Sequence, residues 1–368
     1  MSILFKNKVS FTIVSILLVF AIVLSGCTKE TSPKKALQES LSKSADLKSY
    51  SFKGQMKIED FNFPDEEMEA GEAAYILNLF KSAELSWTGA YRADPMMTEI
   101  NLQFALQGDL AVTFKIPIII TAEKVWVKVP NIPMLPIPEE ITGKFIEFDL
   151  KKLEEMAGEK LPTMDVSKSQ KFVKEITDIV FKHIEEEKYL SSVKVKEAGL
   201  PADVVDVKQV VQLHLDQSQI EPLFTTIVDK IAPEVLDLLS KNKEYLELTQ
   251  LKQEDLDDAK KALAEVKDGE IAEGFAEIKK ELKKLDFKVN YGFDKKNYPV
   301  YTDASFSMAI ESEEATGSFG FKVVSQLSDI NKEVKFEGEP KGDNVISMEQ
   351  LLEQMGGMFG GESFDDSL

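Results

Sequence analysis

The chain has 368 residues, with 44 Lys or Arg against 64 Asp or Glu, and a formal net charge of -20. A surface of this charge repels phosphate polymers and anionic head groups, so nucleic acid is excluded as an expected partner. The single cysteine rules out an internal disulfide, and the core must therefore be large enough to hold the fold by itself.

The first 26 residues have the layout of a secretory signal peptide. Lys6 and Lys8 precede an apolar run over residues 9–24, which ends in small residues. A membrane-spanning helix usually needs about 20 apolar residues. This run is shorter and no cationic cluster follows it directly, so a spanning helix is the second choice.

The end of that segment, Leu24-Ser25-Gly26-Cys27, resembles a bacterial lipoprotein lipobox. The resemblance implies that signal peptidase recognises Leu24, Ser25 and Gly26, cuts before Cys27, and that the Cys27 sulfur carries a diacylglyceryl group. The alternative is a cysteine that lies in a signal sequence by chance. Residues 27–32 would form a lipidated tether, and the protein would be anchored by lipid on the extracytoplasmic face of the cell membrane.

The mature chain begins with a helix and continues into strands. Ser32 is a suitable N-cap with Pro33 at the first helical position, which predicts a helix to about Asp46. The hydrophobic period then changes to two, and the expected strands are apolar on one face only, as in an antiparallel meander. These strands lie near residues 50–58, 84–91, 99–106, 110–116 and 118–129. The acidic residues 59–83 could be a hairpin insertion or a short helix.

Four prolines at positions 130, 133, 136 and 138 exclude both helix and regular strand pairing in this stretch. The favoured interpretation is a stiff loop whose apolar side chains lie back on the core. The alternative is an apolar lip at the mouth of a ligand site or at a membrane-facing edge. The apolar residues concerned are Ile132, Met134, Leu135 and Ile137.

The second half alternates between helical and strand periods. Residues 254–285 form the longest amphipathic segment, which Gly269 divides into two helices. A partner-binding coiled coil is possible there, but a helix on the protein's own sheet is favoured because the heptad spacing fails. The other expected elements are a strand and helix over 144–158, a helix over 167–187, a strand over 205–216, helices over 221–245, strands at 287–293, 300–310, 319–327 and 330–336, and a short helix leading into a flexible tail over 347–368.

The sequence offers no catalytic constellation. The only imidazoles are His183, expected to be hydrogen-bonded and partly buried, and His214, on the polar side of its strand. No zinc-ligand spacing, calcium loop or phosphate-binding glycine motif is present. We therefore expect no enzyme activity, no metal and no cofactor other than the lipid on Cys27.

These patterns predict an α+β fold in which about eleven antiparallel strands form a strongly curved sheet with helices packed on its inner face. The chain resembles the LolA-like and LppX-like superfamily of envelope lipoprotein carriers, an open half-barrel covered by helices. The resemblance rests on the lipobox, on the N-terminal helix entering Tyr50-Ser51-Phe52-Lys53-Gly54, on Val125-Trp126-Val127-Lys128-Val129-Pro130, and on Phe145-Ile146-Glu147-Phe148-Asp149-Leu150 entering a helix. It implies a single domain over residues 33–346 with a helical insertion at 254–285.

The expected function is binding of a lipid or another hydrophobic ligand in a cavity between sheet and helices. The candidate lining residues are Phe52, Met56, Trp87, Phe104, Phe114, Phe306 and Phe321. The alternative is a non-enzymatic structural or interaction lipoprotein of the cell envelope whose core is filled by its own side chains. The expected partners are the membrane, through the lipid anchor, and a hydrophobic ligand, and the sequence does not identify a protein partner.

Overall fold

The computed structural model describes residues 31–62, 81, 83–106, 112–132, 137–157, 166–204, 206–267, 279–311 and 316–351. The predicted signal peptide and lipobox, with Leu24, Ser25, Gly26 and Cys27, lie outside these residues, as does most of the tether. Within the described ranges, no helix has the length and apolar character needed to cross a membrane.

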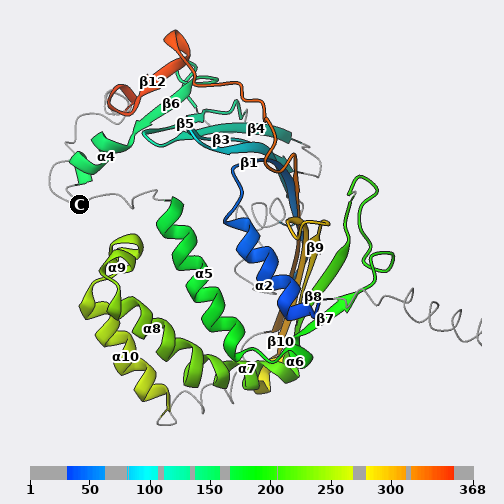
Figure 1. Ribbon diagram of the computed structural model, residues 1–368. Coiled ribbons are helices and arrows are strands. Elements are labelled where there is room, and N and C mark those ends of the chain that lie inside the picture. Colours follow the sequence, from blue (N-terminus) through cyan, green and yellow to red (C-terminus); the bar gives the residue numbers. More distant parts are fainter. Residues whose placement is uncertain are drawn as a thin grey trace, which may run out of the picture.

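The described strands form one mixed sheet of twelve strands, open at both ends, in the order β12-β6-β5-β4-β3-β2-β1-β11-β10-β9-β8-β7 (Figure 1). The α+β class is therefore confirmed. The strands are β1 (Ser49–Asn62), β2 (Glu84–Ala93), β3 (Met96–Leu106), β4 (Val112–Thr121), β5 (Lys124–Lys128), β6 (Phe145–Asp149), β7 (Leu190–Val193), β8 (Gln209–Asp216), β9 (Leu282–Phe293), β10 (Pro299–Glu311), β11 (Thr316–Ser328) and β12 (Val345–Ser347).

Two meanders build this sheet. Strands β1 to β6 follow one another on one side, β7 to β11 on the other, and the pairing of β1 with β11 joins them. Residues 329–344, which we call the strap, then carry the chain from the centre of the sheet to its far edge. There β12 runs parallel to β6, so the prediction of a wholly antiparallel sheet of about eleven strands is wrong at this edge.

The strap also replaces a strand predicted over residues 330–336. The backbone turns at Asp329 (φ 51°) and Asn331 (φ 56°), and the residues that follow pair with no strand. Alternating apolar residues in this stretch reflect contact with the sheet surface, because Phe336 packs beside Met97 and Trp126.

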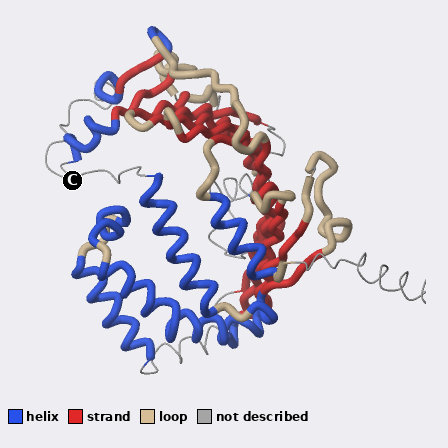
Figure 2. Tube along the Cα trace, in the orientation of Figure 1, coloured by secondary structure: helices blue, strands red, loops and turns tan. Residues whose placement is uncertain are grey.

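The helices gather on one side of the sheet in Figure 2. Helix α2 (Pro33–Ser44) begins as predicted, since the Ser32 side chain accepts a hydrogen bond from the Lys35 amide and Pro33 follows the cap. It contacts α5 (Val166–His183), β7, β8 and β10. The others are α4 (Leu150–Ala157), α6 (Glu186–Tyr189), α7 (Ile220–Thr226), the π-helical turn η2 (Ile227–Ile231), α8 (Ala232–Lys241), α9 (Lys243–Thr249) and α10 (Gln253–Lys267).

The helical segment predicted over 254–285, divided at Gly269, ends earlier than expected. Helix α10 covers Gln253–Lys267, Gly269 lies outside the described residues, and residues 279–281 are helical. Strand β9 then begins at Leu282, where the period-two pattern takes over. Leu256 is buried against Leu239 and Tyr245, so α10 packs mainly on neighbouring helices rather than on the sheet.

The two faces of the sheet differ, and we name them by what covers them. The helix face carries Phe52 and its register partners; α2 packs on part of it, and α5 lies against α2 with Phe181 in the shared buried cluster. The opposite face carries Met97, Ile119 and Trp126, which are buried beneath Phe336 and Val345. The expectation that every strand is apolar on one face only is therefore wrong for β3, β4 and β5, because the strap supplies a second cover.

The beginning of the predicted tail joins the core. Leu351 and Ile346 are buried with Ile141, and Met348 and Ile137 pack against them. Ile137 thus lies back on the core, as the favoured interpretation of the proline-rich loop predicts. Met134, Leu135 and residues 352–368 lie outside the described residues.

Glu99 anchors the strap to the opposite face. Its side chain, only 8% exposed, accepts hydrogen bonds from the backbone amides of Glu337 (2.8 Å) and Gly338 (2.7 Å). A typical intramolecular hydrogen bond contributes about 0.5–1.5 kcal/mol to stability. We expect Glu99→Ala to lower the free energy of unfolding by about 2–3 kcal/mol in urea denaturation. Glu99→Gln, which keeps one acceptor oxygen, should lose less, and equal stability of all three proteins would contradict this anchoring role.

Candidate binding site on the helix face

A pocket of about 400 Å³ lies between α2, α5 and strands β7 to β9. None of the side chains that line it is charged. Burial raises the pKa of Tyr291 and of Tyr189, so both phenols stay neutral at physiological pH. The lining residues are Leu37, Leu41, Ile176, Thr177, Val180, Phe181, Ile184, Tyr189, Leu190, Leu213, Leu215, Leu223, Phe287 and Tyr291.

Regular spacing in each element brings these side chains together. Leu37 and Leu41 are four residues apart on α2, and Ile176 and Val180 are four apart on α5, so each pair shares one helix face. Leu213 and Leu215 are two apart on β8 and therefore point to the same side of the sheet. The pocket arises where two helical stripes face one strand face.

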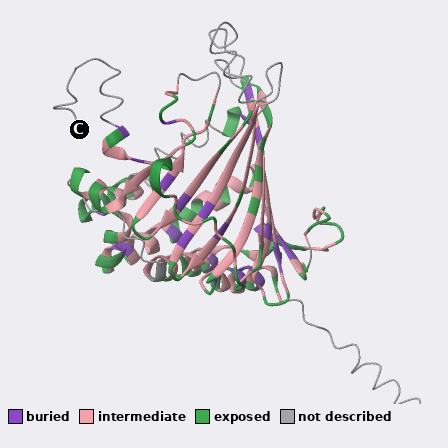
Figure 3. Cartoon of the chain, turned by 90° about the horizontal axis from the view of Figure 1, so that it is seen from above, coloured by how far each residue is buried: buried purple, intermediate pink, exposed green. Residues whose placement is uncertain are grey.

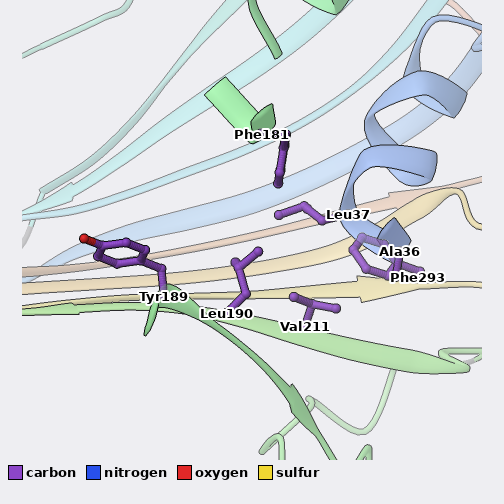
Figure 4. Close-up of a cluster of buried hydrophobic side chains, with 7 residues drawn as sticks. All are labelled: Ala36, Leu37, Phe181, Tyr189, Leu190, Val211 and Phe293. Atoms are coloured by element: carbon purple, nitrogen blue, oxygen red, sulfur yellow. The ribbon is translucent and has the colours of Figure 1, made fainter. Parts of the chain in front are cut away.

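A buried cluster borders the pocket and shares Leu37, Phe181, Tyr189 and Leu190 with its lining. Leu37 and Ala36 of α2 meet Phe181 of α5 and Val211 of β8, with Phe293 beside them (Figure 4). These side chains are almost fully buried. Packed core therefore lies directly beside the pocket.

Polar contacts fix the two helices that flank the pocket. The Lys34 ammonium donates to the Ile184 carbonyl (2.8 Å), which ties α2 to the end of α5. Glu234 of α8 contacts Lys182 and His183 of α5, and hydrogen bonds from Lys182 and then His183 hold the pKa of Glu234 below its usual range. His183 is 15% exposed and 2.9 Å from Glu234, which confirms the prediction of a partly buried, hydrogen-bonded histidine.

A second pocket of about 450 Å³ continues the first between α2 and α5. The two share Leu41 and Thr177. Amides, hydroxyls and the Lys174–Asp178 ion pair (2.7 Å) enter its lining, so the site grades from apolar to polar.

The seven residues proposed from the sequence as cavity lining all point to the helix face, on the adjoining strands β4, β3, β2, β1, β11 and β10. Two pairs stack: Phe104 with Phe114 (centroids 5.2 Å apart) and Phe306 with Phe321 (5.4 Å). The seven residues, namely Phe52, Met56, Trp87, Phe104, Phe114, Phe306 and Phe321, are all of intermediate burial, the class that covers most of the strand surface in Figure 3.

None of these seven residues lines the 400 Å³ pocket. Of the seven residues, Phe306 on β10 lies directly opposite the pocket residue Phe287 on β9. The predicted lining did not include the wall formed by β8 and β9, although a strand was predicted over residues 205–216.

Two glycines let large rings lie flat on this face. A Cβ at Gly54 would overlap the Trp87 indole, and one at Gly89 would overlap both the Phe52 ring and the Glu99 carbonyl oxygen. Glycine inside a strand often marks such a close approach. Phe52 and Trp87 therefore lie along the sheet as parts of its apolar surface.

No protein-family model matches the chain, and a search of curated proteins finds no match either. Among the residues that the structure describes, no group of three or more His, Cys, Asp or Glu side chains could hold a metal ion. The lining of the two pockets on this face is apolar in the first and partly polar in the second.

Proposed function

We propose that the protein is a membrane-anchored extracytoplasmic lipoprotein that binds a lipid or another hydrophobic ligand between its sheet and its helices. The observation that carries this proposal is the 400 Å³ pocket with an uncharged lining. Ligand pockets typically measure about 300–1,000 Å³ and are mostly apolar with a few polar groups.

In this proposal the open sheet acts as a strongly curved half-barrel with helices on its inner face, as in the carriers that the sequence resembles. The half-buried aromatic residues of β1 to β4, β10 and β11 would extend the apolar surface beyond the pocket. A long acyl chain could then pass from the pocket along the sheet. The anchor at Cys27 would keep this surface close to the lipid from which the ligand comes.

The direct test is native mass spectrometry with lipid extraction on purified residues 28–368. We expect a bound hydrophobic molecule that denaturation releases. A ligand-free protein would instead favour the alternative, a structural or interaction lipoprotein with a filled core.

A variant sharpens this test. Val180 lines the pocket from α5, and Val180→Trp places an indole in it. Because overfilling a site costs about 1–3 kcal/mol, we expect affinity for a fluorescent fatty-acid probe to fall roughly tenfold or more.

The matched control is Lys171→Trp, which adds the same ring to an exposed position of α5. It should bind the probe as the unmodified protein does. Equal binding by the Val180→Trp variant would place the ligand elsewhere.

A further inference from the structure

A separate pocket of about 500 Å³ lies on the opposite face of the sheet. The connection between β7 and β8, described over residues 194–204 and 206–208, projects on the side away from α2 and α5 (Figure 1). Gly199, Pro201 and Asp203 of this connection cover parts of β1, β2, β10 and β11. We call this site the loop pocket.

Two ion pairs line the loop pocket. Lys53 of β1 pairs with Asp203 and so holds the loop against the sheet. Lys322 of β11 pairs with Asp303 of β10, with 3.3 Å between Nζ and Oδ2. Each cation is thus matched by a carboxylate, and the four formal charges balance.

The deeper carboxylate retains hydrogen-bonding capacity. Asp303 is only 12% exposed, and both the Lys322 ammonium and the Tyr301 hydroxyl contact its Oδ2 at 3.3 Å. A carboxylate offers about four lone-pair sites, so Oδ1 can accept from a ligand. Gln55 and Thr88 add amide and hydroxyl groups to the lining, each able both to donate and to accept.

The balanced charge of the lining favours an uncharged ligand. An ion would bring an uncompensated charge beside the Lys322–Asp303 pair, and a zwitterion would have to separate this pair, in which Asp303 is largely buried, at a cost in desolvation. A neutral molecule with many hydroxyls can donate to Asp303 and accept from Lys53 while both pairs remain intact.

We propose that the loop pocket binds a neutral, hydroxyl-rich ligand of the size of a short saccharide. Its volume falls within the range of small-molecule sites. Because the sheet separates it from the helix face, this site is independent of the lipid site.

The test is isothermal titration calorimetry of the mature protein with four neutral disaccharides: cellobiose, maltose, mannobiose and N,N′-diacetylchitobiose. Glucuronate and free lysine serve as charged and zwitterionic comparators. We expect saturable binding of at least one disaccharide and none of the comparators. Failure of all four disaccharides, or tighter binding of a comparator, would overturn the proposal.

Variants tie the binding to the pocket. Asp303→Asn keeps the shape but removes the charge that strengthens the hydrogen bonds, and affinity should fall by about tenfold or more. Thr88→Val removes an exposed hydroxyl and should weaken binding several-fold without disturbing the fold. Glu84→Gln changes a carboxylate that pairs with Lys57 on the same face outside the pocket, and it should leave binding unchanged. Unaltered affinity in both pocket variants would contradict the assignment.

Discussion

Replacing Trp126 with alanine is expected to lower the free energy of unfolding by about 3–5 kcal/mol. The indole is only 2% exposed and packs with Met97 and Ile119 under Phe336 of the strap. Its Nε1 donates to Glu147 Oε2 (2.9 Å). The substitution removes both the packing and this hydrogen bond, and it takes the indole away from beneath Phe336.

Urea denaturation followed by circular dichroism measures this loss. Trp87→Ala is the matched control, since Trp87 is half-buried on the helix face and already exposes part of its surface. Trp87→Ala should lower the free energy of unfolding clearly less than Trp126→Ala does. If the Trp87 variant were the less stable one, the strap-covered face would not be the tighter core.

The burial of Trp126 could not be predicted from the sequence. Period-two alternation located nearly all the strands and the face on which Phe52 lies. It could not show that Met97, Ile119 and Trp126 are covered on the other face, because the cover comes from distant chain: Glu99 and Glu337 are 238 residues apart. A local pattern reports which side chains are apolar, but the topology decides which of them are covered.

The position of the candidate pocket also depends on the topology of the sheet. The helices that begin at Pro33 and near residue 167 and the strand over 205–216 were predicted, yet the lining was assigned to β1 to β4, β10 and β11. Which strands α2 and α5 cover depends on the order of strands in the sheet, and β7 and β8 lie at one edge. The spacing within one element contains no information about that order. The pocket therefore opens near this edge rather than at the aromatic centre of the sheet.

The two faces of the sheet carry pockets of different chemical character. The helix face carries an uncharged pocket, whereas the opposite face carries paired charges around the loop pocket. Because neighbouring residues of a strand point to opposite faces, each strand contributes to both. Gly54 and Lys53 of β1 illustrate this, since Gly54 accommodates Trp87 on one face and Lys53 pairs with Asp203 on the other.

Substitution of two phenylalanines of β9 should distinguish a residue of the structural core from a residue of the ligand site. Phe293 is 1% exposed in the cluster with Leu37 and Val211, so Phe293→Ala is expected to lower the free energy of unfolding by about 3–5 kcal/mol. Lipid bound per folded molecule should stay unchanged, because Phe293 is absent from the lining of the 400 Å³ pocket.

Phe287 lines that pocket and is half-buried, so Phe287→Ala should destabilise the protein less than Phe293→Ala does. It should instead change the amount or the chain length of the lipid recovered by native mass spectrometry, because it removes part of the wall. Both quantities come from the same preparations, with unfolding followed by circular dichroism. If the two variants lost equal stability and the lipid content of neither changed, Phe287 would belong to a filled core, and the binding function proposed for this face would fail.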